Sequence, residues 1–169
     1  MKQSLVNKIT AILQQVPLVQ HLSRKKFIAQ FILGVIKSRN VSFCEVAHHL
    51  NDHVKMASNE TRIQDFFRWA TLDYTALALL LVSLLQRTAK LRLCVDRTEW
   101  DFGKCQVNIL LVTVGCGELH WPLCWELLDN KSGDSNAADR SRLFDSCLHA
   151  VGRHRVGLVV GDREFIGHK

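Results

Sequence analysis

Two aspartates, Asp96 and Asp162, each follow a short apolar run, and carboxylates placed in this way are typical metal ligands. Residues 91–96 read LRLCVD and residues 156–162 read VGLVVGD. A buried strand fixes the backbone, and an acid at its end meets solvent at the edge of the sheet. Two such acids on neighbouring strands would hold Mg²⁺ or Mn²⁺ and would suit phosphoryl transfer on nucleic acid. A single aspartate after a strand more often belongs to a turn or a helix cap, so the argument depends on the pair.

The elements that would position these acids begin after residue 90, where the hydrophobic period changes from helical to alternating. Before that point the pattern predicts helices over residues 4–15, 23–37, 43–50, 59–70 and 73–85. After it, the pattern predicts strands over residues 91–96, 106–114, 118–127 and 156–161, and one helix over residues 137–151. The fold class is α/β with an all-α N-terminal region. The order β-β-β-α-β is that of a partial ribonuclease H-like core.

Charge changes at the same place, which fits a helical DNA-binding region over residues 1–90 and a partial catalytic core over residues 91–169. The net charge is +6, with 12 Lys and Arg against 5 acids in residues 1–90 and 10 against 11 in residues 91–169. A basic front half suits a nucleic-acid partner, and acids gathered in the back half suit a metal. Solvated faces of basic helices explain the same surplus equally well.

Composition favours a reduced, cytoplasmic protein with no membrane partner. Six cysteines occur without a C-x-x-C pair, which is typical of buried thiols in a reducing compartment. The longest apolar run, residues 76–85, is shorter than the roughly 20 residues that span a bilayer. Cys116, His120 and Cys124 are evenly spaced but lack the close spacing of a zinc site, so we expect them to be structural.

Residues 42–50 and 59–70 form a candidate helix-turn-helix for DNA binding. Its candidate phosphate contacts are Lys55, Arg62 and Arg68. The predicted connection, residues 51–58, is longer than a tight helix-turn-helix turn, so a plain helical bundle remains the alternative. Histidines near this connection lack an acid or a cysteine to complete a metal site, and we expect them at the surface: His48, His49 and His53.

Three stretches resemble the hairpin-forming DDE transposases of bacterial insertion sequences (the insertion-sequence-four family). They are residues 96–100 (DRTEW), 127–136 (LLDNKSGDSN) and 162–167 (DREFIG), of which the last is the most specific. Residues 27–37 and 62–69 are similar to the helical N-terminal region of that family. The resemblance covers most of the chain.

The resemblance implies a ribonuclease H-like fold in which Asp96 and Asp162 are the first and second catalytic aspartates. It implies a two-metal site for Mg²⁺ or Mn²⁺ in the complete protein, and cutting and joining of double-stranded DNA at transposon ends and target. The protein would then be cytoplasmic and associated with the nucleoid when bound to DNA.

Charged and aromatic residues beside the acids have two interpretations each. Arg97 and Arg163 would contact a DNA phosphate, or would pair with Glu99 or Glu164. Trp100 and Trp121 would stack on an unpaired base, or would be core aromatics, which are commoner.

The third acid of the family is a glutamate in a Tyr…Arg…Glu…Lys signature, and the sequence from Asp162 to Lys169 holds no such segment. We therefore expect the front half of a transposase, from an interrupted or frameshifted gene, inactive alone and assembling as a homodimer or with the full-length enzyme. The alternative is a non-catalytic DNA-binding protein that regulates transposition. A third reading is a small nuclease that completes its site with Glu99 or Glu164.

Overall fold

The computed structural model describes residues 2–51, 53–85, 90–128 and 137–162, and it divides the chain into two compact units, Met1–Leu77 and Ala78–Lys169. The sequence predicted a boundary at residue 90. The structural boundary lies inside helix α5 (Tyr74–Ser83), because Ala78, Val82 and the following Leu85 lie in the hydrophobic core of the second unit. The α/β class is confirmed, with helices followed by a mixed four-stranded sheet.

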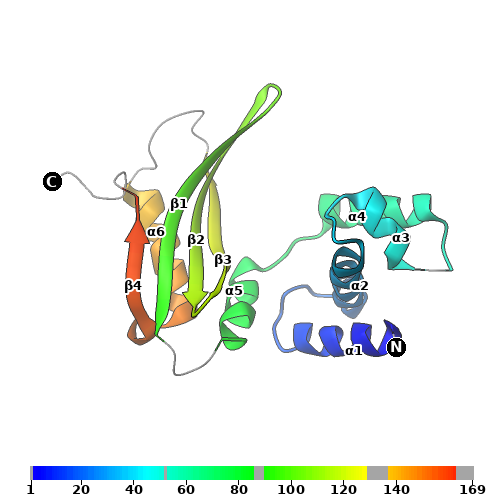
Figure 1. Ribbon diagram of the computed structural model, residues 1–169, viewed down its shortest axis with the longest axis horizontal. Helices are drawn as coiled ribbons and strands as arrows, with labels where there is room; N and C mark the ends of the chain where they lie inside the picture. Colours follow the sequence, from blue (N-terminus) through cyan, green and yellow to red (C-terminus); the bar gives the residue numbers. More distant parts are fainter. Residues whose placement is uncertain (1, 52, 86–89, 129–136, 163–169) are drawn as a thin grey trace. The chain divides into compact units, whose positions relative to one another are not determined.

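The first unit is helical, and its helices lie close to the predicted positions (Figure 1). They are α1 (Lys2–Leu13), α2 (Leu22–Ser38), α3 (Phe43–Leu50) and α4 (Met56–Trp69). Helix α4 begins three residues before the predicted start at Asn59, so the α3–α4 connection is residues 51–55. This connection is shorter than the sequence suggested and closer to a helix-turn-helix geometry.

One hydrophobic cluster of the first unit joins α2, α3 and α4. Its buried residues are Phe27, Val46, Ala47, Leu50 and Ile63. Around them the rings of Phe43 and Phe67 stack with centroids 5.2 Å apart, and the rings of Phe27 and Phe66 lie 4.7 Å apart. Helix α2 approaches α3 closely at Gly34, where a Cβ atom would lie 2.8 Å from Cγ1 of Val46. Glycine at this position therefore lets the two helices pack tightly.

A buried amide fixes α4 against the end of α3. The Nδ2 group of Asn59 donates hydrogen bonds to the carbonyl oxygens of Ala47 and Asn51, each at 3.1 Å, and the side chain is 2% exposed. These carbonyls lie at the C-terminal end of α3, where the last carbonyl groups of a helix have no N–H donor within the helix. Asn59 therefore lies inside α4 as a clamp and not at its start as a cap.

Replacing Asn59 tests this clamp. Asn59→Ala removes both donors from buried carbonyls, and we expect it to lower the free energy of unfolding by about 1–3 kcal/mol. Asn59→Asp should cost more, because a carboxylate oxygen would then face the two carbonyl oxygens. Urea unfolding followed by circular dichroism measures both, with the exposed Gln64→Ala on the same helix as the control. A loss in Asn59→Ala no larger than in the control would contradict the clamp.

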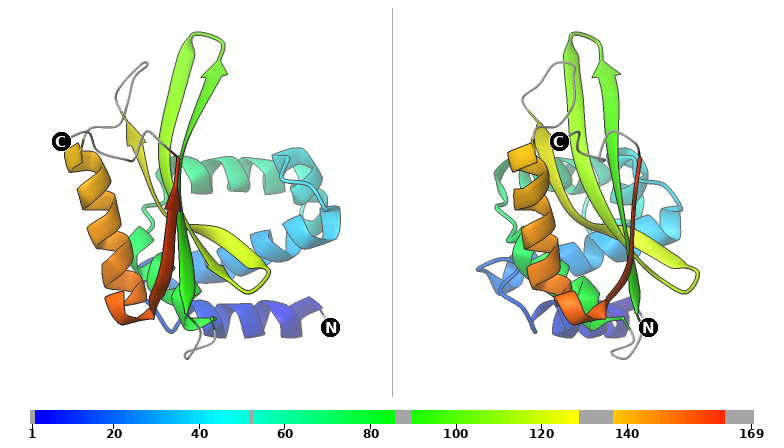
Figure 2. Two further views of the ribbon diagram at one scale, coloured as in Figure 1. Left: turned by 60° about the vertical axis from the view of Figure 1, so that its left-hand side comes forward. Right: turned by 90° about the vertical axis from the view of Figure 1, so that its left-hand side faces the viewer.

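The second unit is a four-stranded sheet with strand order β3-β2-β1-β4 (Figure 1). The strands are β1 (Leu91–Phe102), β2 (Cys105–Cys116), β3 (Leu119–Leu128) and β4 (Val156–Gly161). β1, β2 and β3 pair antiparallel in sequence order, whereas β4 pairs parallel to β1. Helix α6 (Ala137–Val151) precedes β4 and lies along one face of the sheet (Figure 2).

The core of this unit lies between that face and the helices. Alternate strand residues are buried there: Leu91, Leu93, Val95, Leu110, Val112 and Val114. From α6 they meet Leu143, Cys147, Ala150 and Val151. Arg142 of α6 donates to Oε1 of Glu126 on β3 (2.6 Å) and to Oδ1 of Asp139 (2.8 Å), which joins the helix to the sheet on its surface side.

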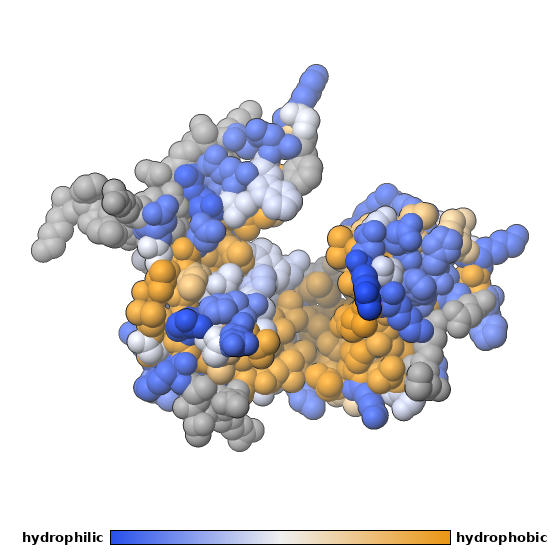
Figure 3. All heavy atoms as spheres, in the orientation of Figure 1, coloured by the Kyte–Doolittle hydropathy of each residue, from blue (hydrophilic) through white to orange (hydrophobic). Residues whose placement is uncertain are grey.

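β4 is the outer strand, and its apolar side chains reach the surface. Leu158, Val159 and Val160 are each about half exposed, and the corresponding surface is apolar in Figure 3. On the described part of the chain, β4 pairs only with β1. It is therefore an edge strand with apolar residues on both faces.

In the described part of the chain, no single helix has the length and apolarity needed to cross a membrane. Helices α4 and α5 reach that length and composition only as a sharply bent pair.

Candidate functional site

Asp96 and Asp162 lie side by side because of the register between β1 and β4. The two strands run parallel, and Val95 pairs with Gly161 at the last position of their ladder. Asp96 directly follows Val95, and Asp162 directly follows Gly161. Neighbouring strands lie about 4.8 Å apart, so the two carboxylates begin from adjacent backbone positions. Both residues are exposed.

The sequence-based prediction that Asp96 ends a strand was wrong. β1 continues to Phe102, because residues 97–102 pair with residues 105–110 of β2 in a long hairpin. The hairpin closes through Gly103 and Lys104, and Gly103 has a φ of +62°, which suits a two-residue turn. Asp96 therefore lies in the middle of a strand, held by β2 on one side, at the point where pairing with β4 stops.

Alternation along β1 places the Asp96 side chain on the face opposite the core. Leu93 and Val95 are buried against the helices, whereas Asp96 is exposed. The backbone N–H of Arg97 donates to Oδ1 of Asp96 at 2.8 Å. This bond to a charged acceptor orients the carboxylate of Asp96.

Arg97 pairs with Glu99, as one of the two interpretations expected. Its Nη1 lies 2.8 Å from Oε1 of Glu99, and only 18% of the Arg97 side chain is exposed. Both residues alternate onto the face opposite that of Asp96. Glu99 therefore does not complete a site with Asp96, which removes one form of the self-sufficient nuclease reading. Arg163, Glu164 and residues 129–136 lie outside the described residues.

The two candidate stacking tryptophans have different environments. Trp121 packs against the core of the second unit, so the core interpretation holds for this residue. Trp100 lies on the β1–β2 hairpin beyond the acid pair and is 57% exposed.

The histidine and cysteine sets that the sequence singled out do not gather into metal sites. Across the described ranges, no group of three or more His, Cys, Asp or Glu side chains is arranged to hold a metal. His120 contacts Nη2 of Arg92 through its Nε2 at 3.1 Å, across Gly115. Cys124 shares a hydrogen bond with Cys147 of α6, which lowers the pKa of Cys124 and, together with burial, raises that of Cys147.

The candidate DNA contacts of the first unit lie on or beside α4. Lys55 directly precedes the helix and is exposed. Arg68 is exposed and lies 3.9 Å from Oδ1 of Asp65, a long and solvated ion pair of small energetic value. Arg62 places its guanidinium 4.9 Å from the centre of the Phe27 ring on α2. Lys55 and Arg68 are thus free to turn toward a phosphate, whereas Arg62 is held beside an aromatic ring.

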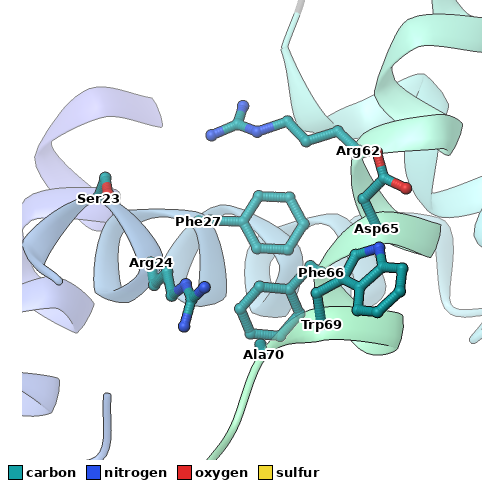
Figure 4. A pocket seen from close by; sticks show the side chains of 8 residues that line it. All are labelled: Ser23, Arg24, Phe27, Arg62, Asp65, Phe66, Trp69 and Ala70. Carbon is teal, nitrogen blue, oxygen red and sulfur yellow. The ribbon is translucent and has the colours of Figure 1, made fainter. Parts of the chain in front are cut away.

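Sequence reasoning missed a pocket next to Arg62, between α2 and α4 (Figure 4). It is lined by Ser23, Arg24, Phe27, Arg62, Asp65, Phe66, Trp69 and Ala70. The residues come from two segments far apart in the sequence. The sequence feature that could have indicated this pocket is the helical spacing of Phe66 and Trp69, with Arg62 one turn before Phe66.

Comparison of the chain with family models, with curated proteins and with solved structures gives no match.

The acid pair has the donor chemistry that Mg²⁺ requires. Mg²⁺ prefers carboxylate oxygens, retains several waters and is commonly held by one or two carboxylates together with substrate phosphates. Asp96 and Asp162 supply two exposed carboxylates at the positions that follow the last paired residues of β1 and β4, Val95 and Gly161. They fit such an ion without further protein ligands from the described residues.

Metal binding at the acid pair predicts a thermal shift. Saturating Mg²⁺ or Mn²⁺ should raise the Tm of the protein by about 2–4 °C, the shift expected for about 1 kcal/mol of binding energy. Asp96→Asn and Asp162→Asn should each abolish this increase.

Differential scanning fluorimetry measures these shifts. The matched control is Asp101→Asn, which removes an exposed carboxylate from the same strand away from the pair. A metal-dependent increase that persists in both Asp96→Asn and Asp162→Asn would place the ion elsewhere.

Proposed function

We propose that the chain is the DNA-binding and metal-binding part of a DDE transposase, with a helical DNA-binding region and a ribonuclease H-like core. The observation that carries the proposal is the parallel β1–β4 register, which brings Asp96 and Asp162 to adjacent positions. The strand order β3-β2-β1-β4, with three antiparallel strands followed by a helix and a parallel strand, supports the same core. The proposal of this particular family rests on the three sequence stretches that resemble the transposases.

The chemistry of the site follows from its two carboxylates. Asp96 and Asp162 would hold Mg²⁺ or Mn²⁺, with the Arg97 N–H fixing one carboxylate oxygen of Asp96 at 2.8 Å. When bound, the metal supplies charge neutralisation at the scissile phosphate and an activated water. The protein contributes the fixed position of the acids, which matters because phosphoryl transfer depends mainly on positioning and electrostatics.

The first unit would hold the DNA. Its basic residues Lys55, Arg62 and Arg68 are the proposed phosphate contacts, and α4 presents the exposed polar residues Thr61 and Gln64 beside them. Phosphate contacts set position and affinity, while polar side chains on an exposed helix face can read base edges.

A non-catalytic DNA-binding regulator of transposition is the second candidate. It is favoured by the exposed basic residues Lys55 and Arg68 at α4, which supply phosphate contacts whether or not a metal is bound. The two candidates share the DNA-binding unit and differ in whether Asp96 and Asp162 act with a metal on DNA.

Mg²⁺-dependent DNA affinity separates the two candidates. A metal held by Asp96 and Asp162 adds a contact to a DNA phosphate. At constant ionic strength, the addition of about 5 mM Mg²⁺ should therefore strengthen duplex binding about three- to tenfold. In the double variant Asp96→Asn/Asp162→Asn, Mg²⁺ should only compete for phosphates and weaken binding. Fluorescence anisotropy with a labelled duplex and a Ca²⁺ comparison gives both affinities. Equal weakening by Mg²⁺ in the parent and the double variant would favour the regulator.

Salt dependence tests the DNA-binding unit itself. We expect log Kd against log salt to be linear, and Lys55→Ala and Arg68→Ala to reduce the slope by about 1 each. Lys8→Ala, an exposed change on α1, is the control and should leave the slope unaltered. If the slope of log Kd against log salt is the same in both variants as in the parent, the DNA interface does not include α4.

We expect the purified chain not to cut DNA, because Asp96 and Asp162 are two of the three acids that the resemblance implies. Supercoiled plasmid incubated with Mn²⁺ should therefore remain intact. Nicking that disappears in Asp162→Asn would instead support the self-sufficient nuclease.

A further inference from the structure

The pocket between α2 and α4 has a volume of about 320 Å³ and combines aromatic walls with positive charge (Figure 4). This volume lies at the lower end of the range of about 300–1,000 Å³ that is typical of small-ligand sites. Phe27 comes from α2, whereas Phe66 and Trp69 come from the last turns of α4. The pocket belongs wholly to the first unit.

The aromatic side chains in this pocket are of two kinds. Phe27 is buried and its ring packs against Phe66, so these two form the floor. Trp69 is 70% exposed, an unusual position for a large apolar side chain that has a neighbouring hydrophobic core. A flat aromatic surface held at the rim of a cavity is suited to stacking on another planar group.

Two arginines flank this aromatic surface. The Arg62 guanidinium lies over the Phe27 ring at 4.9 Å, and Arg24 lines the pocket from the first turn of α2. Among the described residues, neither guanidinium forms an ion pair with a carboxylate. Ser23 lies beside them at the start of α2, where the backbone N–H groups also attract anions. The pocket therefore favours a ligand that has a planar ring and a negative charge.

Asp65 adds an acceptor to this arrangement. Its carboxylate lines the pocket, and its ion pair with Arg68 is long, at 3.9 Å. A carboxylate in a site for an anionic ligand repels that ligand unless the ligand also carries N–H donors that point to it. Adenine, cytosine and guanine have an exocyclic amino group, whereas thymine has none.

We propose that this pocket binds one unstacked nucleotide of a DNA strand next to the duplex held by α4. The base stacks on Trp69, its 5′-phosphate pairs with Arg24, and its amino group donates to Asp65. This inference rests on the DNA binding proposed above and extends it to a nucleotide outside the duplex. It makes the first unit a reader of DNA ends or distorted sites and not of continuous duplex alone.

The test compares one duplex in two forms, blunt and with a three-nucleotide single-stranded tail, by fluorescence anisotropy at constant salt. The parent chain should bind the duplex with a dA or dC tail about tenfold more tightly than the blunt duplex, and a dT tail should give a smaller gain. Trp69→Ala should remove the gain and leave blunt-duplex affinity unchanged, and Trp69→Phe should restore part of it. Arg24→Ala should also remove the gain.

Lys26→Ala is the matched control for Arg24→Ala, because it removes one exposed positive charge from the same helix outside the pocket. It should weaken both duplex forms by the same factor or leave both unaltered. Circular dichroism melting of each variant confirms that the unit remains folded, which is expected because Trp69 is largely exposed.

The other outcomes overturn the inference in distinguishable ways. Blunt-duplex binding with no gain from the tail, or a gain that survives Trp69→Ala, refutes the pocket assignment and leaves the proposed function standing. Binding of free deoxyadenosine monophosphate that depends on Trp69, without a gain from the tail, assigns the pocket to a free nucleotide. The absence of any duplex binding refutes the DNA-binding function and the inference together.

Discussion

The parallel pairing of β1 with β4 is the constraint on which the candidate metal site depends. Parallel neighbours need a crossover, and here α6 provides it by packing Leu143, Cys147 and Val151 against the sheet face that carries Leu93 and Val95. The register then follows from this packing, and it places Asp96 level with Asp162. A shift of β4 by one residue would turn every β4 side chain to the other face and would separate the two carboxylates.

The sequence predicted the elements of this arrangement better than their extents. The apolar run before Asp162 and the helix at residues 137–151 were found because hydrophobic periodicity marks them directly. The far half of β1 was missed, because residues 97–102 are mostly polar or aromatic and form a strand only through pairing with β2. Strand register between β1 and β4 depends on tertiary packing, so the sequence supplied the two acids but could not show that they are level.

The first unit shows the same limit for a different reason. Asn59 is the first residue of the fourth helix that the sequence predicts, yet it is buried inside α4, where its amide satisfies two carbonyls at the end of α3. The pocket at Phe27 and Trp69 joins residues from the second helix and the fourth, and only the packing of those helices brings them together. Patterns along the chain identify a helix face well, whereas a site shared by two helices depends on how the helices pack.

The acid pair concentrates negative charge at one place in a protein whose net charge is +6. Two carboxylates on adjacent strands repel each other, and Nη1 of Arg97 pairs with Glu99 on the opposite face of the sheet. The Arg97 backbone N–H offsets only part of the charge on Asp96. An acidic pair also repels the DNA backbone that the basic first unit would attract. Under the proposed function, a divalent cation held between the carboxylates and a DNA phosphate would remove both conflicts, so metal binding and DNA binding would strengthen each other.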